Sequence, residues 1–289
     1  MADTVTSQPF ETPSGKDAEY ENFPVGSWLL PAALRPHIAT FYHFARAIDD
    51  IADHPDTPAP EKISGLQLFE DALTGEVGDQ SILATAINMK RSLKACEITR
   101  QHCLDLITAF KQDSIKSRYQ NWDELMDYCL LSAAPVGRYL IDLHGGSRNG
   151  YGPSDALCKA LQVINHLQDC QEDYRELDRV YLPDDWMMAA GIDVTELDQD
   201  QCSIALRRVL DQALDATELL MLDARGLPSG VVSFRLAMES AVIIQIANRL
   251  IVKLRHNDPL AGRVKLSKPE YLWCSLKGVL SAIIGAGKA

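Results

Sequence analysis

The chain has 289 residues, of which 46% are hydrophobic, so it can bury a sizeable core. Its 40 acidic and 28 basic residues give a net charge of −12, which argues against nucleic acid as a partner. An anionic substrate would therefore need a local cationic site or bound metal ions.

Residues 1–18 are polar and acidic and lack the basic start and apolar run of a signal peptide, so we expect a disordered leader. We expect one helical domain over residues 19–289, because no low-complexity linker divides them. The seven cysteines include no CxxC pair and are interpreted as reduced thiols of a cytoplasmic protein. No apolar stretch reaches the roughly 18 residues that span a bilayer, which leaves peripheral contact at the inner membrane face as an open alternative.

Apolar residues recur at helical spacing along almost the whole chain, and no convincing strand alternation appears. The predicted fold class is therefore all-α. Glycine, proline and asparagine breakers divide the chain into helices that we predict near 31–54, 62–74, 80–93, 97–116, 121–144, 153–178, 199–225, 231–256 and 269–285. Several of these are long enough to enclose a deep central cavity.

The first carboxylate cluster consists of Asp49, Asp50 and Asp53. Asp49 and Asp53 lie one turn apart on one face of the predicted helix. At an effective dielectric of 20, two charges about 5.5 Å apart repel by around 3 kcal/mol, which makes sense if a divalent cation lies between them. A solvated acidic face is the alternative. The apolar flanks, including Phe44 and Ile48, favour an enclosed site instead.

The second carboxylate cluster repeats this spacing with Asp169 and Asp173, and Asn165 and Gln162 precede them on the same face. Two such helices that face each other would form a cage able to hold several Mg²⁺ ions around a diphosphate. The ions would neutralise the carboxylates and also the leaving group that develops as a C–O bond ionises.

These motifs resemble those of the squalene and phytoene synthases, a family of terpenoid (isoprenoid) synthase fold. The resemblance covers roughly residues 20 to 256. It rests on the first cluster, on Tyr128-Cys129 with Ala133, Val136 and Gly137, on Asn165 through Asp173, and on Arg179-Val180-Tyr181-Leu182-Pro183. Within the family, Glu21 through Pro31 and Arg263 through Lys268 look most like the bacterial hydroxysqualene synthases of the hopanoid pathway.

That subgroup implies a lyase that ionises presqualene diphosphate with about three Mg²⁺ ions and captures the cation with water, giving hydroxysqualene and diphosphate. No nicotinamide is expected. One alternative within the family is head-to-head condensation of two farnesyl or geranylgeranyl diphosphates to presqualene diphosphate, squalene, dehydrosqualene or phytoene. An alternative of another class is a non-catalytic helical scaffold that binds a prenyl lipid or a partner protein. Contact with neighbouring pathway enzymes is a further expectation.

The resemblance assigns roles to ten residues. The catalytic residues are Asp49, Asp50, Asp53, Asp169, Asp173 and Tyr128. Metal ligands are Asp49, Asp53, Asn165, Asp169 and Asp173. Substrate contacts are Arg46, Gln162, Asn165 and Tyr181. A salt bridge to a neighbouring aspartate is the alternative for Arg46, and a packing role is the alternative for each of the two tyrosines.

Other residues receive structural interpretations or count as departures from the family pattern. Many condensing relatives have Leu-Arg-Asp where this chain has Leu167-Gln168-Asp169, so a cation is missing there, which favours the enzyme that binds one diphosphate. A His-Ser-x-Ser-Phe element of many relatives is also absent from Glu19 through Phe23. We expect structural roles for three histidines, His43, His144 and His166. We expect a solvated face, with anionic lipid as the alternative contact, for a basic tail of Arg263, Lys265, Lys268 and Lys277.

Overall fold

The computed structural model of the protein describes residues 29–76, 83–146 and 150–286. The predicted leader and the Glu21–Trp28 part of the subgroup match lie outside these residues. The described residues form helices and one isolated β-bridge, between Tyr119 and Pro183, with no strand among them. The predicted all-α fold class is thus confirmed.

The helices follow one another along the chain with short connections. In order they are α1 (Arg35–Asp53), α2 (Ala59–Thr74), α3 (Ala84–Ala95), α4 (Gln101–Asp113), α5 (Trp122–Ser132), α6 (Ala134–Leu143), α7 (Tyr151–Gln168), α8 (Cys170–Leu177), α9 (Asp184–Ala189), the 3₁₀ helix η3 (Val194–Asp198), α10 (Ile204–Ala224), α11 (Leu227–Gly230), α12 (Phe234–His256) and α13 (Lys268–Ala286).

Two predicted long helices are each divided in the structure. The helix predicted over 121–144 breaks at Ala133, and Pro135 follows in the first turn of α6, where its missing N–H costs no hydrogen bond. The helix predicted over 153–178 breaks at Asp169, which ends α7 and precedes α8 with φ −109° and ψ 10°. Side-chain caps explain other boundaries, since Ser203 caps α10 and Ser233 caps α12.

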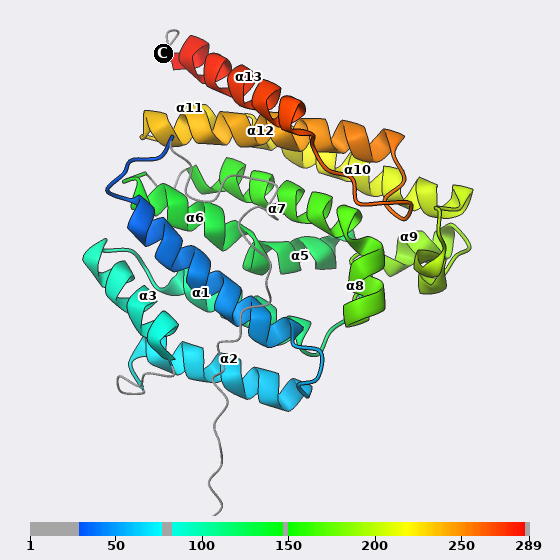
Figure 1. Cartoon of the computed structure of the whole chain (residues 1–289), viewed down its shortest axis with the longest axis horizontal. Helices are drawn as coiled ribbons and strands as arrows, with labels where there is room; N and C mark the ends of the chain where they lie inside the picture. The colour runs from blue at the N-terminus through cyan, green and yellow to red at the C-terminus, as the bar shows by residue number, and fades with distance from the viewer. Residues whose placement is uncertain (1–28, 77–82, 147–149, 287–289) are drawn as a thin grey trace, which may run out of the picture.

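The helices are stacked in layers (Figure 1). On the outside of the fold, α13 packs along α12, and α12 in turn contacts α10 and α7. Helices α5 and α6 pack against α7, and α1 packs against α2, α3 and α4. This arrangement places α1, which carries the first carboxylate cluster, and α7, which leads directly into the second, in the middle layers of the molecule.

Aromatic packing fixes α1 in place. The Phe44 ring is fully buried and meets the buried Phe69 ring of α2 at a centroid distance of 6.1 Å. On an adjacent side of the helix, Phe41 stacks on Tyr139 of α6 at 4.0 Å. Each fully buried aromatic side chain contributes about 1.5–3 kcal/mol of apolar burial, so these contacts hold the helix that carries the first cluster.

Helices α12 and α13 approach each other closely at Gly278. A Cβ atom on Gly278 would lie 2.5 Å from the Val242 Cα of α12, which is closer than real Cβ contacts allow. The inner face of α13 also buries Cys274 and Ala282. None of the helices that the structure describes is both long enough and apolar enough to cross a membrane.

This close approach predicts that Gly278→Ala destabilises the protein by about 1–3 kcal/mol, because the new methyl group meets α12 backbone that cannot easily move. Gly285→Ala in the same helix is the matched control. Nothing lies within 4 Å of a Cβ at Gly285, so helix propensity alone should raise stability by about 0.5–1 kcal/mol. Urea unfolding of both variants tests this, and equal effects would contradict the packing argument.

Candidate active site

A cavity of about 360 Å³ lies between α1, α4, α5, α6, α7, α8 and α12. Nine of the ten residues to which the sequence assigned roles line it, namely Arg46, Asp49, Asp53, Tyr128, Gln162, Asn165, Asp169, Asp173 and Tyr181. Asp50 does not line the cavity, and its carboxylate accepts a hydrogen bond from Arg46 at 3.0 Å. The structure therefore brings residues from both clusters to one space.

Arg46 bridges two aspartates of the first cluster, Asp49 and Asp50. Its Nη1 lies 2.5 Å from Asp49 Oδ2, and its Nη2 lies 3.0 Å from Asp50 Oδ1. These partners are three and four residues along α1, where helical geometry places them on the same face. The salt bridge that the sequence left as an alternative for Arg46 is present. The cavity wall still includes Arg46, so both roles are compatible with its position.

A second arginine, Arg179, binds the remaining aspartate of the first cluster. Its Nη1 lies 2.6 Å from Asp53 Oδ1, and its Nη2 donates to the Ala52 carbonyl at 3.0 Å. Burial works against a charged guanidinium, yet the Asp53 carboxylate holds the pKa of Arg179 above its usual value. Arg179 was part of the sequence motif that carried the family resemblance, but the sequence assigned it no role.

A third arginine comes from far along the chain. Arg263 follows α12 and pairs with both carboxylate oxygens of Asp169, with Nε 2.9 Å from Oδ1 and Nη2 3.0 Å from Oδ2. The prediction that Arg263 belongs to a solvated basic face is therefore wrong, because the residue turns toward the second cluster. Lys265, Lys268 and Lys277 are exposed, as that prediction expected.

The second cluster has a cation beside it, although Gln168 is neutral. Its side chain is buried and donates a hydrogen bond to the Val264 carbonyl, next to Arg263. Gln168 is absent from the cavity wall, and the guanidinium beside Asp169 comes from Arg263 instead. The prediction that the neutral Gln168 distinguishes this chain from condensing relatives stays a prediction, and the second cluster itself has the Arg263 guanidinium beside it.

The break between α7 and α8 sets the geometry of the second cluster. Although Asp169 ends α7, the Asp173 amide still donates to the Asp169 carbonyl at 2.8 Å, which keeps the two residues one turn apart. The Asp173 carboxylate lies 4.0 Å from His166 Nδ1. Burial, together with the charge of Arg179, lowers the pKa of His166 to about 3, so this contact involves a neutral imidazole and is not an ion pair.

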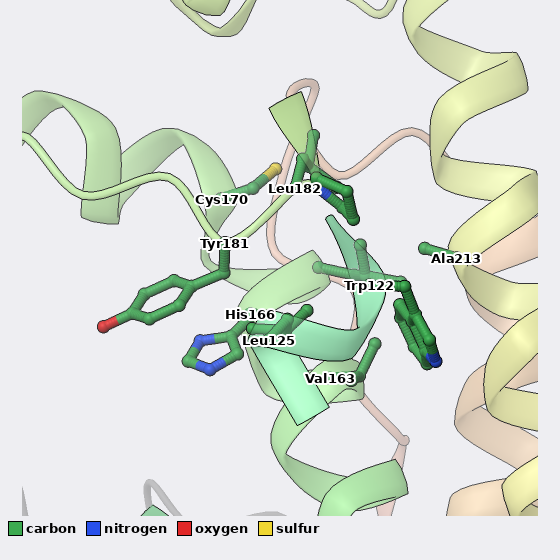
Figure 2. Close-up of a pocket in the computed structure, with 10 residues that line it drawn as sticks. Trp122, Leu125, Val163, His166, Cys170, Tyr181, Leu182 and Ala213 are labelled. Carbon is green, nitrogen blue, oxygen red and sulfur yellow. The ribbon is translucent and has the colours of Figure 1, made fainter. Parts of the chain in front are cut away.

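His166 belongs to a stack of aromatic rings beside the cavity. Its ring lies on the Tyr181 ring at a centroid distance of 3.5 Å, and Figure 2 shows the two side chains next to each other. Tyr181 also stacks with Tyr128 at 5.7 Å and with Tyr119 at 5.6 Å. His166, Tyr128 and Tyr181 line the cavity, whereas Tyr119 does not. Tyr181 therefore packs against other rings, the alternative that the sequence left open, and also contacts the cavity.

Tyr128 is held by a carboxyl group that the sequence analysis missed. The Tyr128 hydroxyl donates to Asp113 Oδ2 at 2.7 Å, and Asp113 is only 6% exposed. Burial raises the pKa of Asp113 to about 7, although the nearby Arg179 charge opposes this shift. Asp113 ends a helix with an apolar pattern, and no neighbouring carboxylate marked it as part of a site.

The residues present fit bound Mg²⁺, although they do not form a closed cage. Across the residues that the structure describes, no three histidine, cysteine or acidic side chains converge on a single point. The predicted cage of carboxylates is therefore not formed by protein groups alone. Mg²⁺ commonly takes one or two carboxylates and completes its shell with water and substrate phosphate oxygens, and carboxylate and amide oxygens from both clusters line one cavity.

The chain was compared with known proteins. The sequence model of the family described as squalene/phytoene synthase matches residues 17–270. A hydroxysqualene synthase of Rhodopseudomonas palustris is 42% identical over 95% of this chain and 93% of its own length. A protein of the same name from Zymomonas mobilis is 41% identical over 90% of this chain and 87% of its own length.

Solved structures agree with this result. A squalene synthase from Alicyclobacillus acidocaldarius aligns with a TM-score of 0.70 and 28% identity over 80% of this chain and 87% of that chain. A dehydrosqualene synthase aligns with a TM-score of 0.75 and 20% identity over 91% of this chain and 92% of that chain. At this identity the likeness shows the fold alone. The family resemblance drawn from the motifs is confirmed, and the chain belongs to the squalene/phytoene synthase family.

Proposed function

We propose that this protein ionises presqualene diphosphate and captures the resulting cation with water, releasing hydroxysqualene and diphosphate in squalene and hopanoid biosynthesis. The observation that carries the proposal is one cavity with two different ends. The two carboxylate clusters lie together at one end, because Arg179 binds Asp53 and its amide donates to the Asp173 carbonyl, while apolar side chains such as Leu140, Leu157 and Ile243 also line the cavity. The near full-length similarity to relatives named hydroxysqualene synthase supports this choice of reaction.

Net charge at the polar end favours a metal-dependent reaction. Its two clusters hold five aspartates against three arginines, so a diphosphate would meet net negative charge. We propose that Asp49, Asp53, Asn165, Asp169 and Asp173 hold Mg²⁺, with three ions per diphosphate. When bound, Mg²⁺ neutralises the charge that develops on the diphosphate as the C–O bond breaks.

The chain's own residues bind the leaving group and shelter the cation. Arg46 and Arg179 can donate to diphosphate oxygens in the geometry that guanidinium groups offer to carboxylates and phosphates. The rings of Tyr128 and Tyr181 present π-faces that attract positive charge. Because His166 is neutral, it adds no positive charge beside a carbocation. Gln162 extends the polar wall toward the apolar part of the cavity.

Two alternatives make different demands on the site. Condensation of two prenyl diphosphates would require two diphosphates to bind at once, and it is the activity expected of other members of the family. A non-catalytic prenyl-lipid scaffold has no use for two aspartate clusters in one cavity. Neither alternative is favoured by a specific contact in the described residues, whereas water capture matches the relatives that align over nearly the whole chain.

Product analysis tests the proposed reaction. Purified protein with Mg²⁺ and presqualene diphosphate should release diphosphate and form hydroxysqualene without NADPH. In H₂¹⁸O, the product should gain one ¹⁸O atom, because the hydroxyl oxygen comes from water. Farnesyl diphosphate alone, the matched control substrate, should give little product. Efficient formation of a C30 hydrocarbon from farnesyl diphosphate alone, or a strict need for NADPH, would overturn the assignment.

Metal dependence tests the role of the clusters. Removal of Mg²⁺ with EDTA should abolish turnover. Each of Asp49→Ala, Asp53→Ala, Asp169→Ala and Asp173→Ala should lower kcat at least about a hundredfold, the loss expected when several kcal/mol of transition-state stabilisation disappear. Glu172→Ala is the control, because Glu172 lies on α8 outside the cavity wall. Near-normal rates in all four aspartate variants would remove the clusters from the mechanism.

We also propose that the outer face of α13 rests on the cytoplasmic surface of an anionic membrane. Six large apolar side chains are exposed along one face of this helix: Leu272, Trp273, Leu276, Leu280, Ile283 and Ile284. Lys277 in α13, Lys268 at its start and Lys265 just before it are exposed. Arg249 and Lys253 neutralise Glu270, which leaves local positive charge on an acidic protein. All seven cysteines are free, as a reducing compartment requires.

Vesicle flotation tests membrane contact. The protein should bind vesicles that contain about one third phosphatidylglycerol and bind pure phosphatidylcholine vesicles at least fivefold less. The double variant Trp273→Ser/Leu276→Ser should lose this binding while it keeps its activity on detergent-dispersed substrate. Ile115→Ser is the control, because Ile115 is another exposed apolar residue and follows α4, which packs against α1, α2, α5 and α6. Equal binding by wild type and double variant would contradict the proposal, as would self-association of the wild type without vesicle binding.

A further inference from the structure

Glu239 is a buried carboxylic acid in the wall of the cavity. It lies in the second turn of α12 and is only 2% exposed. The cavity-facing residues of α12 are Leu236, Glu239, Ser240 and Ile243, whose spacing marks one face of the helix. Glu239 is thus the single charged side chain that α12 contributes to the cavity, and the sequence analysis gave it no role.

Contacts between helices place Glu239 away from the two clusters along the axis of the cavity. The starts of α12 and α7 lie together, because a Cβ on Gly150 would be 3.3 Å from the Gly230 carbonyl. The far ends also lie together, since Arg263 beyond α12 binds Asp169 at the end of α7. The two helices therefore run in the same direction. Glu239 lies near their starts, and the second cluster lies near their ends.

The surroundings of Glu239 keep bulk water away from it. Helix α13 covers α12 from the outside and approaches it to backbone contact at Gly278. Burial, together with the nearby Glu239 charge, raises the pKa of Tyr271 of α13. A buried carboxylate is costly unless polar groups or water solvate it, and a cavity provides room for water. A charged side chain in the wall of a largely apolar cavity is a candidate for a role in the chemistry there.

We propose that the Glu239 carboxylate binds the water molecule that captures the carbocation and accepts its proton. This inference rests on the proposed function. The C–O bond to diphosphate breaks and diphosphate leaves with the electron pair. The water oxygen then forms a C–O bond with its lone pair, while one of its protons moves to Glu239. After the product leaves, this proton returns to solvent. Charges and atoms balance without an oxidant or reductant.

The position of Glu239 explains why water, and not the leaving group, would capture the cation. A nucleophile held beside the metal-binding aspartates would compete with the adjacent diphosphate for the same carbon. Water held by α12 approaches from the apolar part of the cavity, away from the arginines and aspartates of the polar end. A carboxylate there also attracts the positive charge as it moves away from diphosphate during rearrangement.

The test separates ionisation from water capture. Glu239→Leu, Glu239→Gln and the control Gln245→Leu, which lies on α12 outside the cavity wall, are incubated with presqualene diphosphate and Mg²⁺. Diphosphate release and the share of hydroxysqualene among the products are measured separately. Glu239→Leu should release diphosphate within about threefold of wild type, while its hydroxysqualene share falls at least tenfold in favour of hydrocarbons formed by proton loss. Glu239→Gln, which can hold water but not accept its proton, should show a smaller fall, and the control none.

Each other outcome has a definite meaning. An unchanged hydroxysqualene share in both Glu239 variants would overturn the role of Glu239 while leaving the proposed reaction in place. Loss of diphosphate release in both variants, with far-UV circular dichroism and Tm unchanged, would also overturn it, because Glu239 would then act in ionisation. Wild-type protein that forms no hydroxysqualene would overturn the proposed function itself and this inference with it.

Discussion

Pairing of aspartates with arginines at the cavity is the interaction on which the rest of the site depends. Arg46, Arg179 and Arg263 each bind a carboxylate of the two clusters, and they come from three separate parts of the chain. Arg179 is buried in its contact with Asp53, so removing Asp53 would leave an uncompensated buried charge at a cost of about 3–5 kcal/mol, whereas Asp53 is 28% exposed and would lose less without Arg179. These pairs hold α1, the segment after α8 and the segment after α12 around one space. The cavity owes its polar end to them.

Burial shifts the charge state of two groups in the cavity wall. It raises the pKa of Asp113 to about 7 and lowers the pKa of His166 to about 3, so His166 is neutral and Asp113 is only partly ionised near neutral pH. Tyr128 lines the cavity beside them, with its hydroxyl fixed on Asp113. An interior of this kind favours a carbocation through aromatic faces and offers it few nucleophiles. In the mechanism we propose, placement of one water molecule on Glu239 then decides the product.

The sequence predicted most of this fold from apolar spacing and breakers, and it predicted both clusters from their i, i+4 spacing. It did not predict the break at Asp169, because no glycine or proline marks that position. The sequence also did not predict ion pairs between residues far apart in the chain. Arg263 pairs with an aspartate 94 positions earlier, and only the packing of α12 along α7 brings the two together. Asp113 and Glu239 were missed for a related reason: each is a lone acid in an apolar helical pattern, and periodicity alone does not tell a cavity wall from a protein core.

Helix α12 links the two chemical ends of the cavity. Its 23 residues span about 35 Å, with Glu239 in the second turn and Arg263 just beyond its end. Gln168 holds the Val264 carbonyl, and Arg263 holds Asp169, so the segment between α12 and α13 is fastened beside the second cluster by two adjacent contacts. The close packing of α13 fixes the same helix from outside. Because a helix is stiff along its axis, the separation between the leaving-group site and the Glu239 carboxylate is set by backbone geometry. A shift of α12 would therefore move the group proposed to hold water relative to the reacting carbon, which makes the packing of α12 a determinant of product identity even where it touches no substrate.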